Sequence, residues 1–170
     1  MRAASRSELA ISQEEAFVGM LPRMKGITAM VRFATTSDLG EVYELIKGTI
    51  GQDLQKSMFA RTFLDQLDEE RHKLGVYEDE DGKIIGFVGV NCTWTLHTGV
   101  RVAEISEIAV DKDHRNGDVR FKLLEWATEK ACDAGCEKMI LTSRLANEDS
   151  HAFYEKFGFE KTHYRFDRML

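Results

Sequence analysis

The stretch "VDKDHRNGDVRFKLLEWATEKA", Val110 to Ala131, joins two kinds of pattern through a short charged loop. Before the loop, "VRVAEISEIAV" alternates apolar and polar residues up to Val110, as a half-buried strand does. After it, apolar residues recur at helical spacing, and the stripe ends at Gly135, a residue that commonly follows the last turn of a helix. The stretch therefore predicts a strand, a loop and a long helix in succession.

The loop between that strand and that helix is a candidate site for a phosphate group. The first turn of a helix leaves several backbone N–H groups without partners inside the helix, and the helix dipole adds positive potential there. Together these features make a site for phosphate. Most strand–loop–helix turns bind nothing, however, so an ordinary turn is the alternative interpretation.

The length and composition of the chain limit the classes of protein to consider. Its 170 residues, 43% of them hydrophobic, fit one domain with a real core. A net charge of -6 without any cluster of Lys and Arg argues against a nucleic-acid surface. A small polar or cationic partner fits this charge better.

The cysteines and the apolar pattern indicate the compartment. Cys92, Cys132 and Cys136 form no CxxC pair, so we expect neither a disulfide framework nor a thiolate zinc site, and a reducing cytoplasm is the expected location. Residues 1–29 contain no continuous apolar segment, and nothing later approaches the ~18 apolar residues of a membrane span. We therefore expect no membrane partner.

Outside the opening stretch, the chain divides into an appendage and one domain. Residues 1–29 are expected to form an N-terminal extension, either a short helix that ends at Pro22 or a disordered arm, and residues 30–170 form the domain. The expected order in the domain is strand 31–35, helix 36–48, helix 57–73, a hairpin within 74–92 that turns at Asp81-Gly82, strand 100–110, a helix from Val119, strand 138–143, helix 147–158 and an extended segment 159–170. This order indicates the α/β class.

Two segments resemble motifs of the GNAT superfamily of N-acetyltransferases. "HRNGDVRFKLL" is similar to the family's pyrophosphate loop, Q/R-x-x-G-x-G/A, and "NEDSHAFYEKFGF" is similar to its late segment N-x-x-A-x-x-F-Y-x-x-x-G-F. The motifs lie in the family's order, about 30 residues apart, which is far more specific than either one alone. The resemblance runs from Val31 to Leu170. It implies acetyl-CoA as cosubstrate and a mixed α/β fold, with a mainly antiparallel central sheet of about six to seven strands flanked by about four helices.

The resemblance also assigns residues to the cosubstrate. Arg115 takes the family's leading Arg position, and the pyrophosphate-cradling role falls to the backbone amides of Asn116, Gly117, Asp118, Val119 and Arg120. The family's fourth strand, which bonds the pantetheine arm, corresponds to Ile108, Ala109 and Val110. Asn147 stands at a CoA-contacting position, although capping of the last helix would by itself explain this residue.

The loop departs from the family at Asp118 and Arg120, where small residues are preferred. A carboxylate within ~4 Å of a phosphate charge costs on the order of 1 kcal/mol in water, so Asp118 alone would weaken binding. Two features could offset this cost: the Asp118 side chain could cap the following helix, and the Arg120 guanidinium could contact phosphate. We therefore expect CoA binding to be retained.

Acetyl transfer to an amine needs a proton donor for the leaving thiolate. The resemblance places Tyr154 near the thioester sulfur in this role, which suits a phenol beside a basic leaving group. The alternative is a core tyrosine that packs beside Phe153 and Phe157 with its hydroxyl reaching solvent.

A base is also expected, because an amine must be neutral to attack a thioester. Glu107 is the preferred base or water-orienting residue, and a solvated or salt-bridged carboxylate is the alternative. Glu104 and Glu107 are an odd number of residues apart along the strand, which predicts opposite faces of the sheet. His97 and His163 are further candidates, since histidine titrates near neutral pH.

The acceptor is indicated only by a finer resemblance. "AEISEIAV", "KLLEWA" and "SHAFYEKFGFEKTHYRF" together resemble the aminoalkylphosphonate N-acetyltransferases. Arg144, His163 and Arg165 could bind an acidic group on an amine substrate, or form surface ion pairs instead. No ligand spacing supports a metal site, so none is expected.

The expected function is therefore that of a cytoplasmic enzyme that moves acetyl from acetyl-CoA to a primary amine of a small molecule. Direct attack in a ternary complex is expected, with no covalent enzyme intermediate. One alternative is a non-catalytic CoA-binding or regulatory module whose pyrophosphate loop has degraded. Another is a structural partner that forms a homodimer through residues 1–29.

Overall fold

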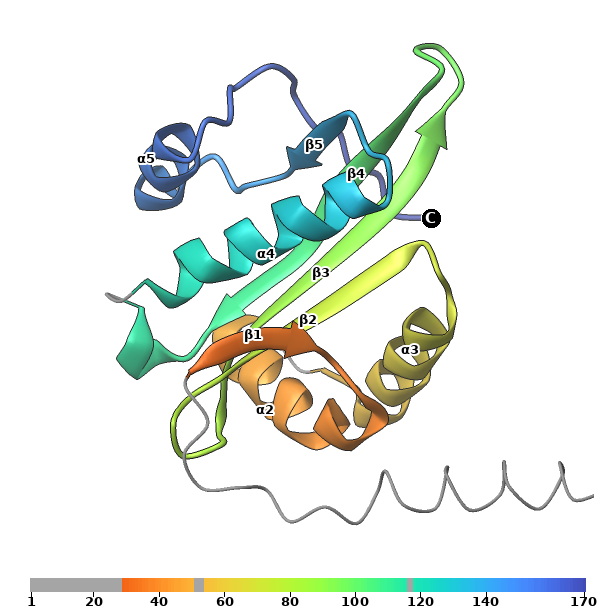
Figure 1. Ribbon diagram of the computed structural model, residues 1–170. Helices are drawn as coiled ribbons and strands as arrows, with labels where there is room; N and C mark the ends of the chain where they lie inside the picture. Colours follow the sequence, from red (N-terminus) through yellow and green to blue (C-terminus); the bar gives the residue numbers. More distant parts are fainter. Residues whose placement is uncertain (1–28, 51–53, 116–117) are drawn as a thin grey trace, which may run out of the picture.

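The computed structural model describes residues 29–50, 54–115 and 118–170, so the expected helix or arm within residues 1–28 lies outside it. One five-stranded sheet runs through the described residues in the order β1-β2-β3-β4-β5 (Figure 1). Neighbouring strands are antiparallel except β4 and β5, which are parallel. The strands are β1 (Met30–Phe33), β2 (His72–Glu78), β3 (Ile84–Thr95), β4 (Val100–Val110) and β5 (Lys138–Leu141).

Four α-helices accompany the sheet in the described residues, in agreement with the expected number: α2 (Leu39–Ile50), α3 (Lys56–Asp68), α4 (Val119–Asp133) and α5 (Glu148–Lys156). Helix α4 packs against one face of the sheet, and α2 and α3 pack against the other. Each of these helices is too short or too polar to cross a membrane.

The number of strands differs from the expected six to seven. Residues 159–170 were expected to be extended, but they form no strand in the described structure and residues 160–170 are all exposed. Phe159 packs against the core, but residues 160–170 bury no apolar side chain, so nothing holds them in one register against β5. A hydrogen bond from Arg165 Nη1 to Thr142 Oγ1, 3.1 Å long, joins this segment to the residue that follows β5.

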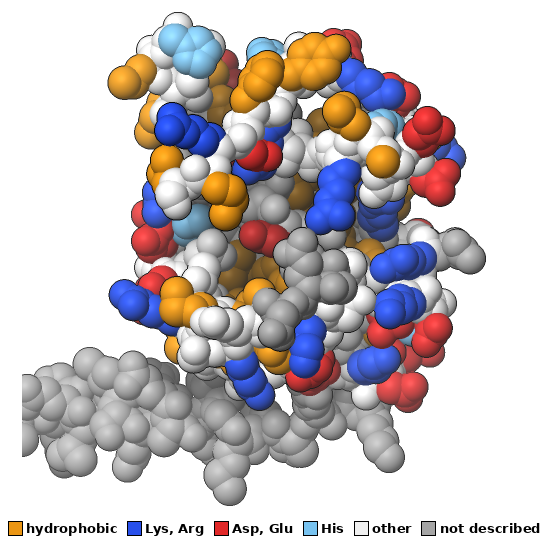
Figure 2. Space-filling model, turned by 180° about the vertical axis from the view of Figure 1, so that it is seen from behind, with side chains coloured by type: hydrophobic (Ala, Val, Ile, Leu, Met, Phe, Trp, Pro, Cys, Tyr) orange, Lys and Arg blue, Asp and Glu red, His pale blue; other side chains and the backbone are white. Residues whose placement is uncertain are grey.

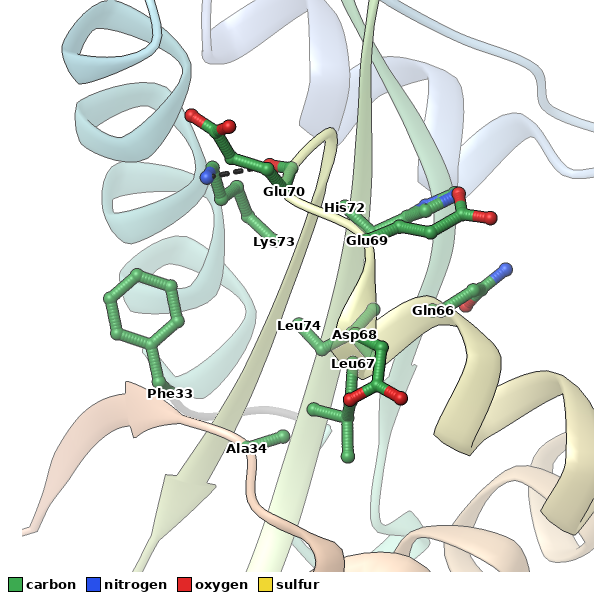
Figure 3. Close-up of a pocket in the computed structure, with 10 residues that line it drawn as sticks. All are labelled: Phe33, Ala34, Gln66, Leu67, Asp68, Glu69, Glu70, His72, Lys73 and Leu74. Atoms are coloured by element: carbon green, nitrogen blue, oxygen red, sulfur yellow. Dashed lines mark hydrogen bonds and ion pairs between the residues drawn. The ribbon is translucent and has the colours of Figure 1, made fainter. Parts of the chain in front are cut away.

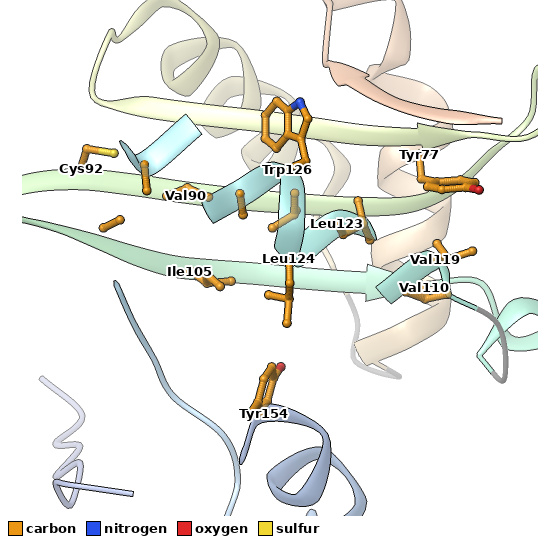
Figure 4. Packing of buried hydrophobic residues seen from close by; sticks show 14 of the residues in the cluster. Tyr77, Val90, Cys92, Ile105, Val110, Val119, Leu123, Leu124, Trp126 and Tyr154 are labelled. Carbon is orange, nitrogen blue, oxygen red and sulfur yellow. The ribbon is translucent and has the colours of Figure 1, made fainter. Parts of the chain in front are cut away.

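Alternation along the strands creates two separate apolar layers. Val88 and Val90 of β3 pack with Leu123 and Leu124 of α4 (Figure 4), whereas Phe87 packs in the layer beneath α2 and α3. Figure 4 also shows Trp126 of α4 over the strands.

Two glycines let α4 approach the sheet closely. A Cβ atom at Gly75 would lie 2.6 Å from the ring of Trp126, and one at Gly86 would lie 2.9 Å from Val119 Cγ1. The first turn of α4 is therefore seated directly on the sheet, beside the end of β4.

A buried ion cluster ties β1 to the start of α2. Arg32 binds both carboxylate oxygens of Asp38 at 2.7 and 2.9 Å, and its Nε binds Glu78 at 2.7 Å. Burial raises the pKa of Asp38, but hydrogen bonds from Arg32 and Thr35 outweigh this effect and lower it below its ordinary value. The cluster is therefore charged at neutral pH and holds this end of the sheet together.

Candidate active site

Strand β4 has a complete partner on one side and a partial partner on the other. It pairs with β3 from Val100 to Val110, but with β5 only from Val102 to Ile105. After Leu141 the chain leaves β4 and runs to α5 (Figure 1). Residues 106–110 therefore have no strand partner on the β5 side among the described residues, and the side of this unpaired edge that faces α5 is called the gap below.

The open side of β4 presents backbone hydrogen-bonding groups. Asp111 N donates to Ile85 O across the β3 side, at 2.9 Å. Because alternate residues of an antiparallel ladder point to opposite sides, Ala109 also bonds toward β3, and Ile108 and Val110 direct their N–H and C=O groups toward the gap. Of the three residues expected to bond the pantetheine arm, Ala109 has its backbone groups turned away, and its side chain is buried under α2.

The loop after β4 leads to the N-terminus of α4. A short 3₁₀ turn, Lys112–His114, begins where the Asp111 carboxylate accepts a hydrogen bond from Asp113 N at 3.0 Å. Arg115 follows and is exposed, whereas the expected cradle residues Asn116 and Gly117 lie outside the described residues. The start of α4 supplies the N–H groups that the sequence assigned to phosphate.

The expected helix cap by Asp118 is not formed. Its backbone has φ −80° and ψ 4°, not the extended geometry from which a capping side chain reaches the amides of the first turn. The carboxylate, 75% exposed, instead lies 3.7 Å from Lys122 Nζ. A hydrogen bond to the Tyr77 hydroxyl, together with the charge of Asp118, raises the pKa of Lys122, so Lys122 is a cation that partly neutralises Asp118.

Arg120 also differs from expectation. Its guanidinium carbon lies 4.2 Å from the ring centroid of Phe153 and 4.7 Å from that of Tyr154, both on α5. A planar cation is attracted to the faces of aromatic rings, and this contact competes with the phosphate contact that was expected. The side chain therefore links the first turn of α4 to α5.

Tyr154 lies on the opposite side of the gap from β4. Figure 4 shows its ring facing Leu124, and the residue is only 8% exposed. The ring makes edge contacts with Phe153 and Phe159, as a core tyrosine would. Its hydroxyl bonds no described residue, so the group expected to donate a proton has no competing structural partner.

The N-cap position of α5 belongs to Asn147, as the sequence indicates. Its side chain makes no capping hydrogen bond, so capping does not account for this residue in the described structure. The expected role in CoA contact stays a prediction.

A β-bulge places the two candidate carboxylates on one face of the sheet. The register steps from Gly89 opposite Glu107 to Val90 opposite Ile105, so Ser106 is the extra residue. Directly paired residues share a face, which puts Glu107 with Gly89 and Glu104 with Asn91, both on the side of α2 and α3. The prediction of opposite faces was wrong, because the extra residue shifts the alternation by one.

Glu107 is held close to the sheet beside the open part of β4. Its Oε2 is hydrogen-bonded to Ser106 Oγ and lies 2.8 Å from the place where a Gly89 Cβ would be. Figure 2 views the molecule from the side opposite to that of Figure 1, and it shows acidic side chains (red) within the hollow in the middle of that side. Ser106 and Gly89 were not among the predicted site residues, although the two successive polar residues Ser106 and Glu107 break the strand alternation and were a signal.

The other proton-transfer candidates lie elsewhere. His97 is in the exposed turn of the β3–β4 hairpin, at the end of β4 remote from Val110. His163 is exposed in the C-terminal segment, where Nδ1 lies 2.7 Å from Thr162 Oγ1. Neither histidine is placed beside the open half of β4.

The residues expected to bind an acidic group follow β5. Arg165 forms an ion pair with Asp167 at 2.9 Å, which is the surface role given as the alternative. The backbone oxygen of Arg144 contacts His151 Nε2 at 2.9 Å, and the Arg144 side chain is exposed. Arg165 Nη1 also lies 3.1 Å from Thr142 Oγ1, so Arg165 lies beside the segment that follows β5.

A cavity of about 300 Å³ lies away from the gap (Figure 3). It is formed where α3 leads into β2, and its wall includes Asp68, Glu69, Glu70 and His72. No residue of β4, α4 or α5 lines it, so it is not continuous with the open half of β4. Within the described ranges no group of three or more His, Cys, Asp or Glu could hold a metal ion.

Comparisons with known proteins agree with this architecture. The model of the acetyltransferase (GNAT) family matches residues 39–159. An aminoalkylphosphonate N-acetyltransferase of Salmonella typhimurium is 31% identical over 144 residues, 82% of this chain and 90% of that protein. In structure, a transcriptional regulator from Bacillus halodurans has a TM-score of 0.76 at 24% identity, and glucosamine-6-phosphate N-acetyltransferase from Arabidopsis thaliana has 0.70 at 24%; each match covers 84% of this chain and 99% of the other.

The chain therefore belongs to the acetyltransferase (GNAT) family. It is an enzyme that transfers acetyl groups, as the two sequence motifs had indicated. The expected fold is confirmed as a mixed, mostly antiparallel sheet with four helices, although with five strands.

Proposed function

We propose that this enzyme moves acetyl from acetyl-CoA to a primary amine of a small molecule by direct attack in a ternary complex. The observation that carries the proposal is the half-open strand β4. Backbone groups of Ile108 and Val110 face the gap, Tyr154 lies on its far side, and Glu107 lies on the adjoining face of the sheet. The expected proton donor, Tyr154, and the expected base, Glu107, thus lie on different sides of the place that the reacting groups would occupy.

The residues around the gap fit acetyl-CoA. The N–H and C=O groups on the open side of β4 can bond an extended pantetheine arm as a neighbouring strand would. The N-terminus of α4, with Arg115 before it, suits the pyrophosphate, since its unpaired amides and dipole favour anions. Lys122 reduces the repulsion that Asp118 would exert on this group.

In the proposed reaction, two side chains move protons. As the ammonium group of the acceptor becomes an amide, its nitrogen loses two protons. Glu107 accepts the first, directly or through one water, which leaves the nitrogen lone pair free to bond the acetyl carbon. Tyr154 donates its hydroxyl proton to the sulfur as the carbon–sulfur bond breaks, and the second proton of the nitrogen returns to the Tyr154 oxygen. No side chain becomes acetylated, because the amine itself is the nucleophile.

An aminoalkylphosphonate is the acceptor that we place first. Its support is the relative from Salmonella typhimurium and the presence after β5 of Arg144, His163 and Arg165, whose side chains could bind a phosphonate. We place the reaction in the cytoplasm, in keeping with the three free cysteines.

The alternative of a non-catalytic CoA-binding module does not fit membership of the acetyltransferase family. The stacking of Arg120 on α5 bears on affinity instead, because it removes one cation from the pyrophosphate loop while the carboxylate of Asp118 stays there.

The test combines binding with turnover. Acetyl-CoA at about a hundred times its Kd should raise the free energy of unfolding by ~2.7 kcal/mol, seen as a higher Tm. Thiol release should then be measured with 2-aminoethylphosphonate, simple alkylamines and amino acids. Transfer to a small amine supports the proposal, and binding of acetyl-CoA without transfer to any of these amines contradicts it. No change in Tm contradicts acetyl-CoA as the cosubstrate.

A further inference from the structure

The bulge at Ser106 gives Glu107 a particular neighbour. The Ser106 Oγ atom is hydrogen-bonded to Glu107 Oε2, and it also lies 3.3 Å from the backbone oxygen of Gly89. A serine hydroxyl has one proton and two lone pairs, so it can donate to only one of these oxygens at a time. Which oxygen receives that proton depends on whether Glu107 carries a proton itself.

Both protonation states of Glu107 can be satisfied by the same three groups. When Glu107 is ionised, Ser106 donates to Oε2. When Glu107 has taken up a proton, its own O–H can donate to Ser106 Oγ, and the serine hydroxyl can turn to donate to the carbonyl oxygen of Gly89. In either state the Glu107 oxygen and the serine hydroxyl keep a partner, and this is what a base needs if it is to hold a proton and then release it.

Gly89 supplies the space that this arrangement requires. A Cβ atom at this position would lie 2.8 Å from Glu107 Oε2 and 3.0 Å from Ser106 Oγ, and Leu74 Cδ2 would lie 3.6 Å away on the β2 side. Any side chain would therefore push the carboxylate off the sheet. In contrast, a Cβ at Gly48 of α2 would meet nothing within 4 Å.

Glu104 shares the face but not the arrangement. It stands opposite Asn91, and its carboxylate makes no hydrogen bond or ion pair with any described residue. The same face also carries titratable groups that have other partners. His72 contacts Glu69 at 3.2 Å, and Glu78 binds Arg32. Glu41 of α2 accepts a hydrogen bond from Ile84 N. Helix α3 turns the apolar Phe63 toward the sheet.

We propose that Ser106 and Gly89 are positioning residues that hold Glu107 against the sheet and give it a hydrogen-bond partner in both protonation states, so that Glu107 and not Glu104 is the base. This inference rests on the proposed function, because it assigns a role within acetyl transfer to an amine. Neither Ser106 nor Gly89 needs to touch the substrate, and both act through the carboxylate.

The experiment is the pH dependence of kcat and KM with an amine that the wild-type enzyme acetylates. Ser106→Ala should move the acid limb of the kcat profile to higher pH by about one unit, since it removes a hydrogen bond to the ionised carboxylate. Ser106→Thr keeps the hydroxyl and should restore the profile. Gly89→Ala should lower kcat by about 10- to 100-fold without changing KM for acetyl-CoA, because the carboxylate is displaced. Gly48→Ala is the matched glycine control.

The outcomes separate this inference from the function on which it rests. If the wild-type chain transfers acetyl to no amine, the proposed function and this inference fail together. If the wild type is active but Ser106→Ala has the same acid limb, the inference alone is overturned. The same holds if Glu104→Gln abolishes that limb while Glu107→Gln leaves it in place. Melting curves identify a Gly89→Ala chain that does not fold, and the serine variants then decide the matter alone.

Discussion

The two flanks of strand β4 differ in how completely they are paired. On the β3 side every residue from Val100 to Val110 except the bulged Ser106 has a partner, whereas on the β5 side pairing covers only Val102 to Ile105. Backbone groups that are paired on both sides can serve only the fold. Those of residues 106–110 that face β5 are left for a ligand, so one strand is structural on one flank and available for binding on the other.

The surroundings of the two flanks also differ in how much of them is buried. The β3 flank carries α2, α3 and the buried cluster of Arg32, Asp38 and Glu78. On the β5 flank, α5 buries only Ser150 and Tyr154, and residues 160–170 are exposed. We therefore expect substitutions on the first flank to change stability and those on the second to change catalysis or binding.

The largest effect is expected on the β3 flank, from Asp38→Asn. Asp38 is 1% exposed, and its loss leaves the Arg32 charge without its bidentate partner and Thr35 N without its acceptor. The free energy of unfolding should fall by about 3–5 kcal/mol in denaturant titrations, with unchanged affinity for acetyl-CoA. The control is Asp65→Asn in the exposed pair with Arg61, which should cost less than about 1 kcal/mol. A similar loss of free energy of unfolding in both variants would contradict the expected difference between the buried and the exposed ion pair.

The same carboxylate predicts a pH dependence. Although burial raises the pKa of Asp38, the hydrogen bonds from Arg32 and Thr35 lower it overall. A lowered folded-state pKa stabilises the protein above the ordinary value of about 3.9, and this contribution is lost as the pH falls through the lower folded value. The stability difference between wild type and Asp38→Asn should therefore be constant above about pH 5 and narrow below about pH 4. A difference that grows on acidification would refute this sign.

The next largest effect is expected on the β5 flank, from Tyr154→Phe. If Tyr154 protonates the leaving thiolate, kcat should fall about 10²-fold, with Kd for acetyl-CoA nearly unchanged. Stability should change little, because the ring packing remains and the hydroxyl bonds no described residue. The matched control is Tyr164→Phe in the exposed C-terminal segment. An unchanged kcat would leave Tyr154 with a packing role only.

A smaller effect is expected from Arg120→Ala, which cuts the contact between α4 and α5. Two ring contacts of this cation should contribute on the order of 1 kcal/mol to stability, readable as a lower Tm. Arg115→Ala is the comparison: it should lower CoA affinity and leave Tm nearly unchanged, because Arg115 is exposed in the loop. If Arg120→Ala instead lowers affinity for CoA at unchanged Tm, the guanidinium binds phosphate in solution.

The smallest effect is expected from Asp118→Asn. Removal of this exposed carboxylate from the start of α4 should tighten CoA binding by ~0.3–1 kcal/mol, and the gain should shrink as salt rises. Calorimetric titration with CoA and with pantetheine measures it, since only CoA carries the pyrophosphate. Asp133→Asn, at the other end of α4, is the control. Equal gains with both ligands would show that the loop is not the phosphate site.

Local patterns in the sequence were enough for most elements and for the family. They failed at residues 159–170, which form no strand, and at the end of helix 57–73, since α3 ends at Asp68 and β2 begins at His72. The alternation before Val110 and the apolar stripe after Val119 both follow from backbone periodicity, and the turn at Asp81-Gly82 follows from the left-handed conformation that Gly82 adopts. The two motifs identified the family because each combines residue type with spacing.

Contacts between distant segments decided the details of the site. The face to which Glu107 points depends on an extra residue at Ser106, which exists only as a mismatch between β3 and β4. The partners of Asp118 and Arg120 depended on where Lys122 and the rings of α5 lie.

The sequence by itself determined most of the strands and helices, and it predicted that one strand–loop–helix unit carries amides suited to an anion, because these properties arise within a few residues. Only the tertiary structure decided that β4 is paired on one flank and half open on the other. Pairing joins residues far apart in the chain, and its extent depends on where β5 ends and on the bulge, neither of which a local pattern contains.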